Sequence, residues 1–169
     1  VFNLAGVNRP KDEREFMEGN FGFASTLLDT LRDHDNHCPV MLSSSIQATR
    51  IGRYAESDYG RSKKAGEELF FDYGRETGSE VLVYRFPNLF GKCRPNYNSV
   101  IATFCHNMAQ DLPIQVNDPT TELELLYIDD LVSEMIEAMQ GRPHRCDYDG
   151  LTPVASPEGC HCYCPITYR

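Results

Sequence analysis

The feature of this sequence that most restricts its fold is the alternation of short apolar segments with longer amphipathic ones. Uncharged, mostly apolar runs occupy residues 1–6, 39–42 and 81–84, whereas apolar side chains recur at helical spacing over 20–33 and 59–75. Short buried runs indicate strands, and apolar residues at a period near 3.6 indicate helices. Strands that alternate with helices are typical of a parallel sheet connected by helical crossovers. We therefore expect an α/β fold.

The second half of the chain continues this alternation. We expect an amphipathic helix over 99–110, strands over 112–116 and 122–128, and a helix that Asp129 and Asp130 cap and that runs through Met139. Residues 141–169 are rich in Pro, Gly and Cys and have no periodicity, so we expect an irregular tail there. The ordered part of the fold should then span residues 1–140.

Charge and cysteine content exclude several classes of protein. The net charge of −9 argues against nucleic acid or a membrane surface as a partner, because both are anionic. The sequence shows neither a long apolar span nor a signal peptide, so we expect a cytoplasmic protein. Seven cysteines form an odd, scattered set, which favours reduced thiols over a disulfide framework.

The tail cluster Cys160, His161, Cys162 and Cys164 raises the question of a zinc site. Its spacing lacks the two-residue gap of common zinc motifs, and no second pair of ligands follows it. We therefore expect no metal site.

Two groups of residues could carry chemistry. Tyr59 and Lys63 are four residues apart on an expected helix, so they share one face, and a nearby ammonium lowers the pKa of a phenol from about 10. Ser43, Ser44 and Ser45 follow the strand 39–42, at the end where open α/β sheets bind ligands. The alternative interpretations are an exposed helix with one aromatic residue and an ordinary serine loop.

Taken together, these motifs resemble the extended short-chain dehydrogenase/reductases that act on nucleotide sugars. The matching motifs, in the family's order, are Asn3-Leu-Ala-Gly6, Asn20 with Phe21, Gly22 and the Leu27-Leu28 pair, Ser45, Tyr59 with Lys63, Tyr84-Arg-Phe-Pro-Asn-Leu-Phe-Gly91 and Leu126-Tyr-Ile-Asp-Asp130. The resemblance covers residues 1 to about 140. It implies a partial Rossmann-like parallel sheet, containing the later strands only, with a small substrate-binding portion.

The same resemblance implies that residues 1–140 form the catalytic part of an NAD(P)-binding domain together with substrate-binding segments, and that 141–169 is a truncated tail. Such enzymes hold the cofactor pyrophosphate on a glycine-rich turn after their first strand. No such turn occurs here. We therefore expect this chain to lack the first three strands of the fold, which leaves a sheet edge unpaired.

The resemblance also implies roles for four residues near the reacting carbonyl. Tyr59 would be the general acid that protonates the sugar carbonyl oxygen, and Ser45 would orient that oxygen. Lys63 would bind the nicotinamide ribose and lower the pKa of Tyr59. Asn20 would support a proton relay, although a helix cap is the alternative role for it.

Further roles are implied at the cofactor and the substrate. Ala5 and Gly6 would pass close to the cofactor, and Pro87 would lie against the nicotinamide. Asn88 would contact the substrate's diphosphate or sugar, and Arg94 would bind phosphate, because a guanidinium matches phosphate oxygens. The alternatives are a strand terminator at Pro87 and an exposed surface cation at Arg94.

Within the family, residues 85–98 and 111–117 are most similar to the capsular-polysaccharide branch. That branch reduces a 4-keto UDP-sugar with NADPH in UDP-N-acetyl-L-fucosamine synthesis. The similarity implies a UDP-sugar substrate, NADPH as cofactor (NADP or NAD across the family) and a homodimer formed through helices 20–33 and 59–75. Two alternatives remain: an epimerase with tightly held NAD, and a non-catalytic module that binds a sugar nucleotide or assists assembly.

Overall fold

The structure is a computed structural model that describes residues 1–143, 148–149, 152–153 and 160–163. These residues fall into two compact units. The first consists chiefly of residues 1–86, and the second chiefly of residues from 87 onward to the end of the last long helix. Each unit is described by itself.

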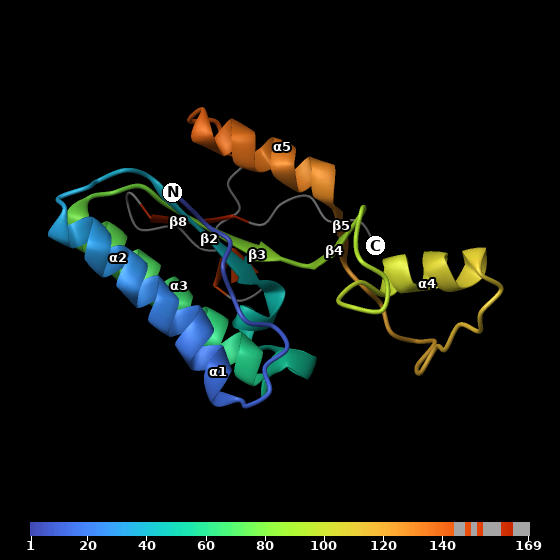
Figure 1. The fold of residues 1–169 in the computed structure, drawn as a ribbon. Coiled ribbons are helices and arrows are strands. Elements are labelled where there is room, and N and C mark those ends of the chain that lie inside the picture. The colour runs from blue at the N-terminus through green and yellow to red at the C-terminus, as the bar shows by residue number, and fades with distance from the viewer. Residues whose placement is uncertain (144–147, 150–151, 154–159, 164–169) are drawn as a thin grey trace. The chain divides into compact units, whose positions relative to one another are not determined.

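The first unit is built on a parallel sheet (Figure 1). Its strands are β1 (Phe2–Asn3), β2 (Val40–Ser45), β3 (Val81–Phe86) and β8 (Cys160–Tyr163), hydrogen-bonded in the order β1-β2-β3-β8. All three pairings are parallel. The expected α/β class and the partial Rossmann-like sheet are therefore confirmed.

The tail expected to be irregular contributes strands to this unit. Besides β8, it contains β6 (Tyr148–Asp149) and β7 (Thr152–Pro153), which pair antiparallel with each other.

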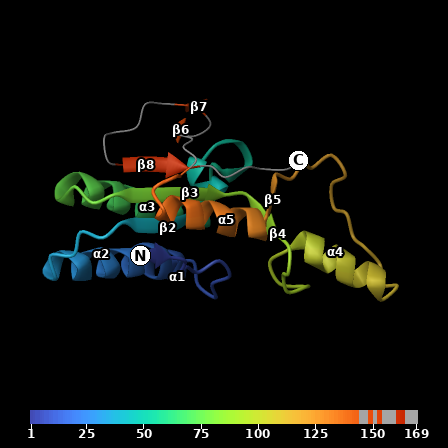
Figure 2. The same ribbon diagram turned by 90° about the horizontal axis from the view of Figure 1, so that it is seen from above.

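Helices line the sheet of the first unit. Helix α1 (Arg14–Phe16) continues through a π-helical turn (Met17–Gly22) into α2 (Phe23–Asp33), and α3 (Asp58–Thr77) is the longest helix. Figure 2 shows α2 and α3 running side by side along the sheet. Their apolar faces and those of β2 and β3 form the buried core, which consists of Ala24, Leu28, Leu31, Val40, Leu42, Phe70, Tyr73, Val81 and Val83.

Local signals fix where α3 begins and ends. Ser57 caps the first turn, and its Oγ accepts a hydrogen bond of 2.9 Å from the backbone N–H of Gly60. Gly78 follows the last turn with φ of 72°, a left-handed conformation that glycine adopts without steric cost. Short 3₁₀ turns over Ile46–Thr49 and Gly52–Tyr54 connect β2 to this helix.

The three serines lie inside β2 and do not close it, which corrects the expected strand 39–42. Ser43, Ser44 and Ser45 continue the register with β3 as far as Phe86. Their hydroxyls do not end the strand, because the backbone groups stay paired and the buried Ser44 hydroxyl bonds to Glu67.

The second unit contains a two-stranded parallel sheet and two helices. Strands β4 (Asn88–Phe90) and β5 (Leu125–Tyr127) pair with each other, and the helices are α4 (Val100–Ala109) and α5 (Ile128–Met139). Asp129 and Asp130 lie in the first turn of α5, but Tyr127 occupies the cap position without a side-chain cap. The expected cap was therefore wrong by two residues.

The strand expected over 112–116 is absent from the second unit. Leu112, Ile114 and Val116 are exposed by 48%, 39% and 57%, and Asn107 donates a side-chain hydrogen bond to the carbonyl of Pro113. Alternating apolar residues form a strand only when a neighbouring strand satisfies their backbone, and 112–116 is paired with no other strand in the described part of the chain.

The core assignment is testable with two phenylalanines that both lie on helices. Phe70 is fully buried in the core, whereas Phe23 is 48% exposed. Phe70→Ala should lower the free energy of unfolding by about 3–5 kcal/mol through lost burial and the cavity it leaves. Phe23→Ala should cost less than about 1 kcal/mol. Urea unfolding of both variants checks this, and equal losses would contradict the assignment.

Candidate active site at the carboxyl end of β2

Ser45 and Tyr59 are brought together where β2 ends and α3 begins. Ser45 is the last residue of β2, and its Oγ accepts a 3.2 Å hydrogen bond from the N–H of Gln47. Tyr59 lies in the first turn of α3, and its phenol is near enough to the Ser45 side chain for Ser45 to lower its pKa. Gly60 permits this approach, because a Cβ there would lie only 2.3 Å from the Gln47 carbonyl oxygen.

Lys63 lies one turn further along α3 on the same face. Only 6% of Lys63 is exposed, its Nζ donates a 2.9 Å hydrogen bond to the carbonyl of Ser43, and it lies 5.7 Å from the centroid of the Tyr59 ring. Burial lowers the pKa of Lys63 to about 8, and the charge of Glu67 partly offsets this fall. The ammonium is therefore close to its titration range at neutral pH.

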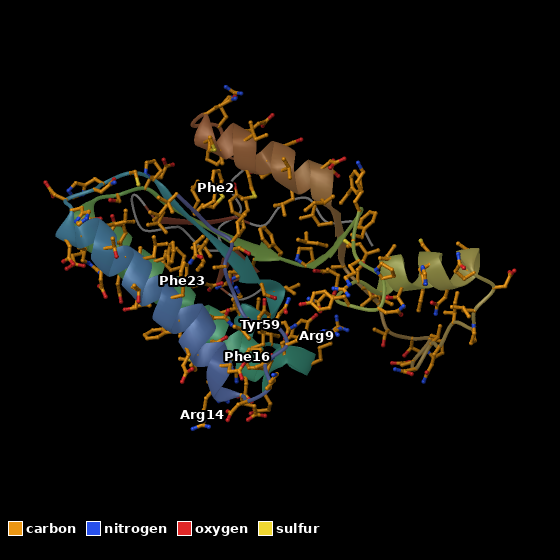
Figure 3. The ribbon with its side chains drawn as sticks, in the orientation of Figure 1. Phe2, Arg9, Arg14, Phe16, Phe23 and Tyr59 are labelled. Atoms are coloured by element: carbon orange, nitrogen blue, oxygen red, sulfur yellow. The ribbon has the colours of Figure 1, made fainter. Side chains whose placement is uncertain are left out.

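The expected effect of Lys63 on Tyr59 was wrong for this structure. Burial raises the pKa of Tyr59, and the interaction with the Ser45 side chain only partly opposes that rise. Phe16 contributes to the apolar surroundings, with its ring centroid 5.7 Å from that of Tyr59 (Figure 3). The Lys63 ammonium lies over the ring and bonds to Ser43, so desolvation of the phenolate dominates.

Asn20 joins the loop after β1 to the start of α3. Its Oδ1 accepts from the N–H of Val7 at 2.8 Å, and its Nδ2 donates to the Val7 carbonyl at 3.1 Å and to Ser62 Oγ at 2.9 Å. Ser62 Oγ in turn donates to the Tyr59 carbonyl at 2.8 Å. Asn20 lies within a π-helical turn and is not a helix cap; its part in a proton relay stays a prediction.

Ala5 and Gly6 lie just after β1 and are both exposed. A Cβ on Gly6 would lie 2.8 Å from Asn20 Oδ1 and 2.9 Å from Lys63 Nζ, so a larger residue would displace these two side chains. An open backbone at the carboxyl ends of parallel strands, beside a hydrogen-bonding ammonium, suits the ribose of a nicotinamide cofactor. These residues therefore fit the expected cofactor.

Three expected site residues belong to the second unit, and their roles stay predictions. Pro87 is buried, whereas Asn88 is exposed and donates from its backbone N–H to the Glu124 carbonyl at 3.1 Å. Arg94 is exposed, and its guanidinium lies 5.6 Å from the centroid of the Tyr97 ring.

The sequence reasoning missed a buried polar network next to Lys63. Glu67 is fully buried, accepts a 2.5 Å hydrogen bond from Ser44 Oγ and forms a bidentate ion pair with Arg85. The spacing in the sequence could have indicated that Glu67 is buried. Glu67 follows Lys63 by four residues and therefore lies on the helix face where Phe70 is buried.

Neither a metal site nor a membrane span is found within the part of the chain that the structure describes. No group of three or more His, Cys, Asp or Glu side chains there could hold a metal ion, and no helix there is long and apolar enough to cross a membrane. The side chains of the tail cluster Cys160, His161, Cys162 and Cys164 lie outside the described residues.

Comparison with known proteins finds a matching family model and similar relatives. The model of the NAD dependent epimerase/dehydratase family matches residues 1–148. The chain is 43% identical over 143 residues to a UDP-2-acetamido-2,6-beta-L-arabino-hexul-4-ose reductase of Pseudomonas aeruginosa, covering 84% of this chain and 37% of that protein. It therefore spans little more than a third of this relative's length.

Solved structures agree with this comparison. The capsular polysaccharide assembling protein CapF from Staphylococcus aureus superposes with a TM-score of 0.72 at 40% identity, covering 99% of this chain and 40% of that one. A UDP-glucuronic acid 4-epimerase from Bacillus cereus, in complex with NAD, also gives 0.72, at 21% identity over 83% of this chain and 49% of its own. The second likeness shows the fold alone. The resemblance inferred from the sequence motifs is confirmed.

The pKa of Lys63 predicts how stability depends on pH. The unfolded chain has the ordinary value of 10.5 and binds more protons than the folded chain between pH 8 and 10.5. The free energy of unfolding should therefore rise across this window, by about 3 kcal/mol from this group. Lys63→Met should abolish that part of the rise, and the exposed Lys11→Met should keep it. Urea unfolding at several pH values checks this; identical slopes in all three proteins would contradict it.

Proposed function

Because this chain belongs to the NAD dependent epimerase/dehydratase family, we propose that it carries the catalytic residues for NADPH-dependent reduction of a 4-keto UDP-sugar. The main support for this proposal is that Ser45, Tyr59 and Lys63 lie together at the carboxyl end of β2. The 43% identity to a reductase of a UDP-hexul-4-ose supports the substrate class. Within this proposal the reaction belongs to the UDP-N-acetyl-L-fucosamine route to polysaccharide precursors.

Tyr59 is the proton donor in this proposal. NADPH, when bound, supplies the hydride that the carbonyl carbon accepts. The Tyr59 hydroxyl then gives its proton to the carbonyl oxygen, so the ketone becomes an alcohol. A raised pKa suits this role, because the phenol stays protonated at neutral pH until the oxygen gains charge.

Ser45 and Lys63 prepare the site for that transfer. The Ser45 hydroxyl, which lies near the phenol of Tyr59, orients the carbonyl oxygen toward that phenol. The Lys63 ammonium has two further donor hydrogens beyond the one given to Ser43, and these can hold the ribose hydroxyls of the cofactor. Asn20 keeps the loop of Ala5 and Gly6 in place through its two bonds to Val7.

The remaining assignments extend the proposal to the second unit and to assembly. Pro87 lies against the nicotinamide, while Asn88 and Arg94 bind the sugar diphosphate. The protein acts in the cytoplasm as a homodimer that pairs through α2 and α3. Light scattering of the purified protein measures the oligomeric state directly.

Removal of the Tyr59 hydroxyl tests the proposal. Tyr59→Phe should lower kcat about 100- to 10,000-fold, the usual contribution of a positioned general acid. Tyr54→Phe is the matched control, because its hydroxyl accepts a hydrogen bond from the exposed Arg53 and has no role in the proposed transfer, so this variant should keep full activity. NADPH oxidation with a 4-keto UDP-sugar, followed by absorbance, gives both rates.

The assay should use this chain and also a chimera in which it replaces the 143 matching residues of the Pseudomonas aeruginosa reductase. A Tyr59→Phe chimera with normal turnover would refute the proposed acid. Redox-neutral conversion of a UDP-sugar with retained NAD would instead identify an epimerase. A protein that gains thermal stability with UDP-sugar but never oxidises NADPH would be a binding module.

A further inference from the structure

A buried carboxylate lies at the junction of the three elements that build the site. Glu67 comes from α3, and its Oε1 accepts from Ser44 Oγ of β2 at 2.5 Å and from Arg85 Nε of β3 at 2.9 Å. Its Oε2 accepts from another Arg85 nitrogen at 2.8 Å. Glu67 is fully buried and Arg85 is 6% exposed, so water does not compete strongly for these bonds.

Ser44, the partner of Glu67 on β2, lies between two residues of the candidate site. The Ser43 carbonyl accepts a hydrogen bond from the Lys63 ammonium, and the Ser45 hydroxyl lies near the Tyr59 phenol. Ser44 lies between them and is tied to Glu67. A carboxylate that fixes Ser44 against α3 therefore fixes both neighbours relative to Lys63 and Tyr59 on the same helix.

Glu67 also supplies the negative charge nearest to Lys63 along the helix. Among the described residues, the other groups that lie against the Lys63 side chain are uncharged: Tyr59 on α3, the Ser43 carbonyl on β2 and Gly6 after β1. Arg85 on β3 approaches this region through its ion pair with Glu67. Without the carboxylate, two cations would remain in one buried region, which disfavours protonation of the lysine.

We propose that Glu67, bound by Arg85 and Ser44, is a positioning residue that keeps the Lys63 side chain protonated and fixes the end of β2 against α3. The inference deepens the proposed reductase function, because an ammonium at Lys63 is needed to hold the cofactor ribose. Glu67 acts on the site indirectly, through the charge of Lys63 and the hydroxyl of Ser44.

The test is the titration of Lys63 in this chain, read from the NMR shift of the methylene beside the ammonium and assigned with Lys63→Met. The wild-type midpoint should lie near pH 8. Glu67→Gln should lower it by about one pH unit, because the opposite charge is gone while the shape is kept. Glu68→Gln removes the same charge from the adjacent, exposed position and should leave it unchanged. Equal midpoints in wild type and Glu67→Gln would overturn the proposal.

A second variant covers the case in which Glu67→Gln fails to fold. In Glu67→Gln/Arg85→Met, the introduced side-chain amide can still accept a hydrogen bond from Ser44. The buried Arg85 cation is removed together with the Glu67 carboxylate, and folded proteins often tolerate the replacement of a whole buried ion pair. The Lys63 midpoint should again fall below the wild-type value. A midpoint at or above that value would overturn the proposal.

The outcome is separable from that of the proposed function. The titration needs no substrate, so a protein without reductase activity can still show that Glu67 controls Lys63. In the active chimera, the basic limb of the kcat/KM profile should move to lower pH in Glu67→Gln and stay in place in Glu68→Gln. If Glu67→Gln lowers the rate but leaves the pH dependence of kcat/KM unchanged, Glu67 has only a structural role. That result would overturn the positioning assignment.

Discussion

The packing of helix α3 against the parallel strands β2 and β3 is the constraint on which the site depends. The ion pair between Glu67 and Arg85 crosses this interface, and the hydrogen bond from Ser44 extends it to the second strand. The apolar part of the same interface continues through Phe70 and Val83. One helix face thus combines a conventional core with the polar groups of the site, so a change in the position of α3 would move every group that it carries.

Burial of ionisable groups in this interface lowers stability and also shifts the pKa values of Lys63 and Tyr59. Desolvation makes the Lys63 ammonium less favourable, which is why its pKa falls to about 8, and it disfavours the Tyr59 phenolate. Both effects cost stability relative to apolar residues of similar size. The fall brings Lys63 closer to its titration range at neutral pH, whereas the rise keeps the Tyr59 phenol protonated there.

Close backbone approaches complete the geometry. Gly60 allows the start of α3 to reach the Gln47 carbonyl, and Gly6 leaves room beside the Lys63 ammonium. Asn20 holds the chain after β1 by bonding to both backbone groups of Val7, as a neighbouring strand would. These two bonds fix the position of Val7 in the loop, and the parallel strands β1 and β2 end on the same side of the sheet.

The sequence by itself determined the fold class, the alternation of strands and helices over residues 1–86, and the shared face of Tyr59 and Lys63. These follow from apolar periodicity and from residue spacing within single elements, which are local properties. Only the tertiary structure decided that 112–116 forms no strand, that Glu67 meets Arg85, and that the pKa of Tyr59 rises. Strand pairing, ion pairing and desolvation depend on which distant segments come together, and no local pattern in the chain encodes that contact.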